Sequence, residues 1–146
     1  LSADGIRALD GAQLAALTSS QVIALSTTQV AAIDAADIGR LVKIQLLSLS
    51  ASQIAALDDE QLAALTGKQL AMLSGMQLQA LSTEQMQALE PGDLAMMKAA
   101  QLQALSVEQL GALDGAQQAA LTMKQYLALD AAHQDALDIT LVGIGG

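Results

Sequence analysis

A fixed period of eight residues constrains the fold of this chain more strongly than any single residue, because self-similarity at a constant spacing indicates a repeat architecture. Counted in octads from Leu1, the first position is Leu throughout, except where Ile33 and Met97 replace it. The consensus is Leu-Ser/Thr/Asp-x-x-Gln-Leu-x-Ala, and no insertion breaks its register. We therefore expect eighteen copies of one structural unit.

The second and fifth positions predict that a helix begins in every octad. A Ser, Thr or Asp at the N-cap accepts a hydrogen bond from an early helical N–H, and a Gln three residues later reaches back to the N-cap N–H. Pro91 stands at the third position, which this interpretation makes the first helical residue, where proline is well tolerated. The capping-box glutamines are Gln13, Gln21, Gln29, Gln45, Gln53, Gln61, Gln69, Gln77, Gln85, Gln101, Gln109, Gln117 and Gln125.

One long helix does not fit this period. Eight residues advance about 80° beyond two full turns, so the apolar stripe would wind around a continuous helix and could not stay buried. A β-solenoid is the alternative, but Ala and Gln fit strands poorly and the chain lacks an alternation of period two. We expect short helices that break once per repeat.

The predicted fold is an all-α solenoid whose helices bury the first, fifth, sixth and eighth positions against neighbouring repeats. Met72 and Met96 lie 24 residues apart, and Asp10, Asp34 and Asp58 follow the same spacing. This echo favours three helices per coil, with two as the alternative. We expect the solenoid to span residues 1–138, and residues 139–146, which lose Gln and Ala, to form a boundary or cap.

Charge and composition exclude several partners. The net charge of −9 repels phosphate backbones and anionic lipids, so nucleic acid is not an expected partner. The longest run without charge, residues 11–33, contains Gln13, Gln21 and Gln29, and we do not expect membrane insertion. Cysteine is absent, which excludes disulfides and thiolate metal sites.

No catalytic, cofactor or metal constellation can be assembled from the sequence. His133 is the single histidine and replaces the fifth-position Gln, with Asp130 and Asp135 near it in sequence. A metal site or a general base needs a second group at a fixed distance. We expect His133 to be a tolerated substitution, the chain not to be an enzyme, and no cofactor to be bound.

Two stretches depart from the consensus and are the candidate sites for a protein partner. Residues 33–48 introduce basic side chains, and residues 89–104 introduce methionines beside a lysine. Large apolar residues at an outward seventh position, Ile23, Leu47 and Leu127, would add to such a surface if they lie together. The candidate residues in the two stretches are Arg40, Lys43, Met96, Met97 and Lys98.

The consensus resembles the Leu-Thr-x-x-Gln-x-x-Ala octapeptide arrays found in large bacterial surface or secreted proteins that are adhesin-like. Copies such as LSTTQVAA at 25–32 and LDDEQLAA at 57–64 carry the resemblance, which covers essentially the whole chain. It implies a non-catalytic spacer or stalk outside the cell, with flanking domains of a longer parent chain as neighbours. The alternatives are a solenoid module that binds a protein or peptide, and a cytoplasmic location.

Overall fold

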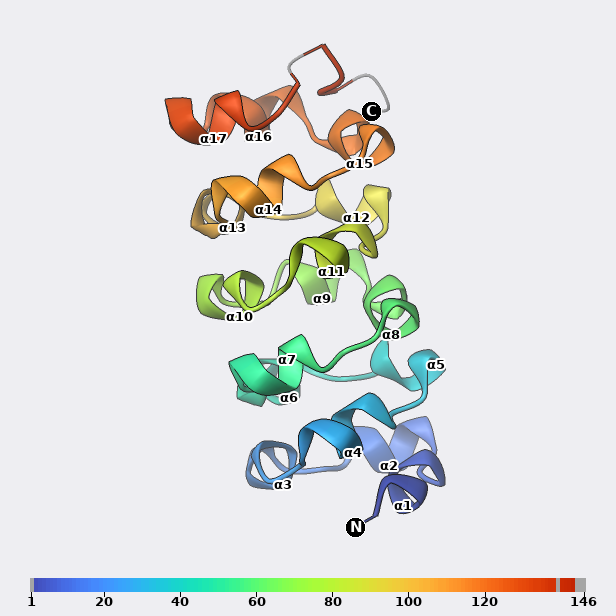
Figure 1. Ribbon diagram of the computed structural model, residues 1–146. Helices are drawn as coiled ribbons and strands as arrows, with labels where there is room; N and C mark the ends of the chain where they lie inside the picture. Colours follow the sequence, from blue (N-terminus) through green and yellow to red (C-terminus); the bar gives the residue numbers. More distant parts are fainter. Residues whose placement is uncertain (1, 139, 144–146) are drawn as a thin grey trace.

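The computed structural model describes residues 2–138 and 140–143, and over these residues the chain forms a solenoid of short helices. Figure 1 shows the helices stacked into a column, with the N-terminus at one end and the C-terminus at the other. Seventeen helices of four to six residues and no strand occur in the described part of the chain. The predicted all-α solenoid is confirmed, and the β-solenoid alternative is excluded.

Each of the first seventeen octads contributes one helix. The helices are α1 (Ala3–Arg7), α2 (Gly11–Ala15), α3 (Ser19–Ile23), α4 (Thr27–Ala31), α5 (Ala35–Ile38), α6 (Lys43–Ser48), α7 (Ala51–Ala55), α8 (Asp59–Ala64), α9 (Gly67–Leu70), α10 (Gly75–Gln79), α11 (Thr83–Gln87), α12 (Pro91–Leu94), α13 (Ala99–Ala104), α14 (Val107–Gly111), α15 (Gly115–Ala120), α16 (Met123–Leu127) and α17 (Ala131–Asp135).

Two to four residues separate consecutive helices, and after α8 they are two extended residues that turn the chain. Between α8 and α9, Leu65 has φ −60° and ψ 132°, and Thr66 has φ −79° and ψ 158°. These are the first and second positions of the octad, and any L-residue adopts such angles. Among the described residues only Gly143 has a positive φ, at 80°. The repeated bend therefore needs no glycine.

Three helices form one coil. Each helix packs against helices three places away in the chain, as in the pairs α3 with α6, α5 with α8, α10 with α13 and α12 with α15. A coil therefore holds three octads, or 24 residues, as the aspartate and methionine spacings predicted, and the two-helix alternative is wrong.

The core is a continuous apolar column made by the sixth and first positions. Leu62 and Leu78, at the sixth position, are fully buried, and Leu65 and Leu73, at the first position, are nearly so. Burying a leucine side chain contributes about 1.5 to 3 kcal/mol. A helix of five residues is not stable by itself, so this burial between coils supplies the stability that a single repeat lacks.

The two irregular stretches keep the core but lose their side-chain caps. Asp34, Val42, Glu90 and Lys98, the N-cap residues of α5, α6, α12 and α13, accept no capping hydrogen bond. Valine and lysine have no side-chain acceptor, and α12 instead begins at Pro91, where a missing N–H costs nothing. Local irregularity in these stretches therefore leaves the stacking intact.

The last octad differs from the others. Its described residues, 137, 138 and 140–143, form a turn rather than a helix. Leu137 and Val142 are buried in the core cluster, so this segment packs onto the final coil. The predicted boundary segment, residues 139–146, lies partly outside the described residues, at 139 and 144–146.

Candidate functional site

The fifth-position glutamines join each coil to the preceding one, and Gln61 shows how. Its side-chain Oε1 accepts a hydrogen bond from the N–H of Asp58 at 3.0 Å, which completes the capping box of α8. Its Nε2 donates to the carbonyl oxygens of Val30 at 2.9 Å and Ile33 at 2.8 Å in the preceding coil. The side chain is 1% exposed. One amide thus links the start of α8 to the end of α4 in the preceding coil.

The same arrangement repeats through the solenoid. In every case Nε2 donates to the carbonyl oxygens 31 and 28 residues earlier, at 2.7 to 3.3 Å. We call the glutamines that make both bonds the glutamine ladder: Gln45, Gln53, Gln61, Gln69, Gln77, Gln85, Gln101, Gln109, Gln117 and Gln125.

The other three predicted glutamines lie nearer the N-terminus, in α2, α3 and α4. Gln13, Gln21 and Gln29 each make both bonds of the capping box in their own helices. In the ladder, Gln45 and Gln101 make only the Oε1 bond of the box, because their N-cap residues lack an acceptor. The geometry of the ladder is that of a structural motif, since backbone groups hold both the oxygen and the nitrogen of each neutral ladder amide.

A second set of inter-coil links comes from glutamines at the seventh position, which the sequence pattern did not single out. Gln79 and Gln87 donate through Nε2 to the carbonyl oxygens of Ala104 at 2.6 Å and Ala112 at 2.9 Å in the following coil. Glutamine at the seventh position in several neighbouring octads was the available signal. These links are exposed and therefore weaker than those of the ladder.

His133 takes the place of a ladder glutamine and fills only part of its role. Its Nε2 lies 2.8 Å from the carbonyl oxygen of Leu105, 28 residues earlier, and its Nδ1 lies 2.7 Å from Oδ1 of Asp130. The missing acceptor for the Asp130 N–H is supplied by Oε1 of Gln103, at 3.0 Å. The substitution is thus accommodated by a side chain from the preceding coil.

The contact between His133 and Asp130 changes the proton affinity of both groups. The hydrogen bond to the Asp130 carboxylate, together with the one to the Leu105 carbonyl, raises the pKa of His133 above 6.5 despite partial burial. Hydrogen bonds from the His133 backbone and ring and from Gln103 lower the pKa of Asp130 to about 2. An imidazolium can donate from both nitrogens, which suits the two oxygens that it faces. The pair stabilises the last coil, and its ring nitrogens are already engaged.

Arg40 lies against the preceding coil. Its Nε is 3.6 Å from Oδ1 of Asp37, and its aliphatic stem covers Gly11 of α2, where a Cβ would overlap Arg40 Cδ. The guanidinium group remains largely exposed. The glycine therefore makes room for a large residue at the eighth position, where the consensus has Ala.

The candidates in residues 89–104 do not form one surface. Met97 is 3% exposed and belongs to the core at a first position, so it cannot contact a partner, and this assignment is corrected. Met96 is partly exposed and covers Gly67 of α9, as Arg40 covers Gly11. Lys98 is exposed at the N-cap of α13. Of the two methionines that the sequence suggested as a partner surface, Met97 is thus a core residue and Met96 is partly exposed.

Asp93 replaces a ladder glutamine in α12 and shows what is lost with it. Burial raises the pKa of Asp93, the negative charge of Glu90 raises it further, and a hydrogen bond from the Gly67 N–H acts in the opposite direction. A carboxylate is shorter than the glutamine side chain and, when ionised, only accepts hydrogen bonds. It therefore contacts an N–H of the preceding coil rather than the two carbonyl oxygens.

An apolar strip runs across α3, α6 and α10, and it is the clearest exposed feature. Ile23, Ile44 and Leu47 line one shallow depression together with Lys43, and Leu47 also lines a second depression with Met76. Figure 1 shows α3, α6 and α10 along one side of the column. We call Ile23, Ile44, Leu47 and Met76 the apolar strip.

The apolar strip is more exposed than its composition would suggest. Ile44 is 63% exposed and Met76 is 82% exposed. Both stand at the fourth position, which faces outward, whereas Ile23 and Leu47 stand at the seventh. Sequence reasoning identified the seventh-position residues and missed Ile44 and Met76, although a large apolar residue at an outward position was the signal for all four.

Several kinds of site are not found in the described part of the chain. It contains no group of three or more His, Cys, Asp or Glu side chains that could hold a metal ion. No helix in it is long and apolar enough to cross a membrane. Every buried side-chain nitrogen and oxygen there has a hydrogen-bond partner, so none is left to mark a ligand site.

The stacked coils and the glutamine ladder define a helical repeat array. Residues 86–123 match the family model described as the ALTTAQ repeat, which supports this class independently of the coordinates. No curated protein and no solved structure matches the chain. The architecture is therefore supported by a family match and by the geometry of the molecule itself.

Proposed function

We propose that the chain is a non-catalytic structural repeat array that serves as a rigid spacer or stalk between other parts of a larger bacterial surface or secreted protein. The observation that carries the proposal is the glutamine ladder, which fixes each coil on the preceding one through buried hydrogen bonds. A stack joined in this way resists bending at every interface, since tilting one coil would strip partners from a buried amide.

The match to a repeat family and the resemblance to octapeptide arrays of adhesin-like proteins support the spacer proposal. The acidic surface supports it as well, because a net charge far from zero disfavours self-association. Under this proposal the neighbours are flanking domains of the parent chain, and the location is the cell surface or the medium. Protease treatment of intact producing cells tests the location, since a cytoplasmic protein would be protected.

Small-angle scattering on lengthened chains tests the spacer role. One or two copies of residues 65–88, three complete octads, are inserted between Ala88 and Leu89. A rigid stack should lengthen by about 8 to 10 Å for each added coil, the usual spacing of packed helices. A maximum dimension that does not grow, or that grows with the square root of the added length, would contradict the proposal.

A second candidate function is favoured by the apolar strip. Ile23, Ile44, Leu47 and Met76 form adjoining exposed apolar surface, and such surface is a common mark of a protein contact. Lys43 at its edge and the two serines of the same depression, Ser19 and Ser48, would form a polar rim. We infer that the strip would bind an apolar peptide or helix face.

Binding of a hydrophobic fluorescent dye tests the second candidate. The wild-type chain should enhance the dye's fluorescence, and the double variant Ile44→Ser, Met76→Ser should lose most of that enhancement. Leu127→Ser is the matched control, since Leu127 is 67% exposed and belongs to α16, outside the strip. Equal losses in the control and the double variant would show that the strip is not a binding surface.

A further inference from the structure

The two ends of the solenoid differ. At the N-terminal end, residues that are buried between coils elsewhere in the solenoid are only partly covered. Leu9, Leu17 and Leu25, at the first position, are half-buried, whereas the equivalent residues in the next coil, such as Leu41 and Leu49, are buried. Ala8, Ala16 and Ala24, at the eighth position, are exposed. The apolar face of the first coil is therefore only partly covered.

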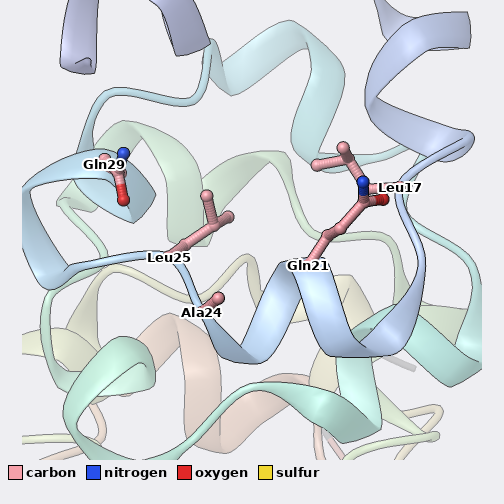
Figure 2. Close-up of a pocket in the computed structure, with 5 residues that line it drawn as sticks. All are labelled: Leu17, Gln21, Ala24, Leu25 and Gln29. Carbon is pink, nitrogen blue, oxygen red and sulfur yellow. The ribbon is translucent and has the colours of Figure 1, made fainter. Parts of the chain in front are cut away.

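A hollow lies on this face. Figure 2 shows Leu17, Gln21, Ala24, Leu25 and Gln29, from α3 and the chain around it, lining that hollow. One coil later the corresponding first-position residues, Leu41 and Leu49, pack against the preceding coil. We call the surface made by Leu9, Gln13, Leu17, Gln21 and Leu25 the N-terminal face.

Two glutamines on the N-terminal face are oriented like ladder residues. Oε1 of Gln13 accepts from the N–H of Asp10 at 2.9 Å, and Oε1 of Gln21 accepts from the N–H of Thr18 at 2.8 Å. These bonds hold each amide in the orientation that it has in the ladder. In the described part of the chain no carbonyl oxygen accepts a hydrogen bond from Nε2 of Gln13 or Gln21. Nε2 of Gln45, one coil after Gln21, by contrast donates to two carbonyl oxygens.

The C-terminal end is closed by different residues. At the sixth position of the last coil, where other octads carry an apolar side chain, stand Gln118, Tyr126 and Gln134. Nε2 of Gln118 donates to the Leu113 carbonyl at 3.0 Å, and its Oε1 accepts from the N–H of Asp138 at 2.8 Å. These are one of the two acceptors, and the donor, that a ladder glutamine at position 141 would have used.

The remaining surface of the last coil is closed in the same way. Nε2 of Gln134 donates to the Tyr126 carbonyl at 3.0 Å, an oxygen at the sixth position, where other coils receive a ladder glutamine from the coil that follows. Val142 is buried against this end, and Leu121 and Leu129, at first positions, are also buried. The last coil therefore has polar partners and apolar cover of its own.

We propose that the N-terminal face is a stacking surface for one further coil of three octapeptide repeats that precede it in the same chain, whereas the C-terminal face ends the stack. The occupant is defined by its chemistry: paired carbonyl oxygens at first and sixth positions, set to receive the amides of Gln13 and Gln21, and an apolar edge to cover Leu9, Leu17 and Leu25. The inference goes beyond a spacer role, because it gives the array a direction of growth.

A second copy of this chain fits the N-terminal face less well than such a coil. At the C-terminal face of that copy, the carbonyl oxygens of Leu113 and Tyr126 already accept hydrogen bonds from glutamines of the same chain. Two N-terminal faces brought together would present amide donors to amide donors. The N-terminal face carries the same groups, in the same arrangement, as the coil interfaces inside the molecule. This likeness points to a preceding coil rather than to a dimer.

Thermal unfolding of extended chains tests the proposal. One chain carries a copy of residues 65–88 directly before Leu1, a second carries the same residues after Gly146, and a third carries a scrambled version before Leu1. The N-terminal coil should raise Tm by at least about 4 °C, the shift that corresponds to one or two kcal/mol for a chain of this size. The other two extensions should leave Tm within about 1 °C of the parent.

A paired substitution then ties the effect to the two amides. Gln13→Met with Gln21→Met removes the same capping bonds in the parent and in the N-terminally extended chain. The pair should lower Tm by at least about 4 °C more in the extended chain, because only there would Nε2 have carbonyl partners to lose.

Three results would overturn the proposal: an equal rise in Tm from the scrambled or C-terminal extension, an equal cost of the paired substitution in both chains, or sedimentation of the parent as a dimer that the pair abolishes. None of them bears on the scattering test of rigidity, so the two proposals can fail separately.

Discussion

Replacing one ladder glutamine should destabilise the array far more than replacing its counterpart in the first coil. Gln61→Met keeps the length of the side chain and removes its hydrogen bonds. The Val30 carbonyl would keep a second donor, the N–H of Ile33 at 3.1 Å. The Ile33 carbonyl and the Asp58 N–H would lose the ladder bonds described above. Leaving these two groups without partners costs about 3 kcal/mol, most of it at the buried Ile33 oxygen.

Calorimetry measures this cost. For a chain of about 150 residues, 3 kcal/mol lowers Tm by about 6 to 10 °C. The control is Gln13→Met in the first coil, which removes the single bond to the exposed Asp10 N–H and should cost about 1 kcal/mol, or about 3 °C. Equal shifts for Gln61→Met and Gln13→Met would refute the claim that the inter-coil bonds, rather than the capping bonds, hold the stack together.

Two further predictions concern pH and close packing. The hydrogen bond of protonated His133 contributes stability to the folded state that is fully present below pH 6.5 and is lost as pH rises through the raised folded pKa. The stability that ionised Asp130 contributes is present above pH 3.8 and is lost as pH falls toward its folded pKa of about 2. In Tm measurements from pH 6 to 9 the wild type should therefore lose stability relative to His133→Gln, and a constant difference would contradict the assignment. Gly75→Ala should lower the free energy of unfolding by about 1 kcal/mol in denaturant titrations, because its Cβ would meet that of Ala104 at 2.9 Å. Gly92→Ala, with nothing within 4 Å, should raise it by about 0.5 to 1 kcal/mol, and a loss at Gly92 equal to that at Gly75 would contradict the packing argument.

The glutamine ladder also suggests how such an array tolerates sequence variation. Where the fifth position carries Asp93 or His133 in place of a ladder glutamine, a neighbouring coil supplies part of the lost contact, through Gly67 in one case and Gln103 in the other. Each interface has several independent links, so the loss of one weakens a single step of a nearly one-dimensional structure. Variation can accumulate in the octads while the stack persists.

Local structure was predictable because the signals for it lie within eight residues. Asp58 and Gln61 are three residues apart, and reciprocal bonds of this kind form where a helix begins, so the helix starts could be inferred directly from the sequence. The sixth-position residues, such as Leu62, follow from the helical wheel. The break after each helix follows as well, because a period of eight cannot keep one stripe buried on a continuous helix.

Tertiary structure decided which octads meet. The 24-residue spacing is faint in the sequence, because the first and sixth positions are nearly the same in every octad and would suit two or three helices per coil. The second role of Gln61, as donor to Val30 and Ile33, joins residues about thirty positions apart and could not be derived from one repeat. The burial of Met97 and the exposure of Ile44 likewise depend on how the coils stack.

The sequence alone therefore determined the unit of this protein: a capped helix of about five residues with one apolar face, because capping and helical periodicity are short-range effects. The stacking order, the two carbonyl partners of each ladder glutamine and the difference between the two ends were decided only in three dimensions. They depend on the distances between coils, which no pattern within eight residues records.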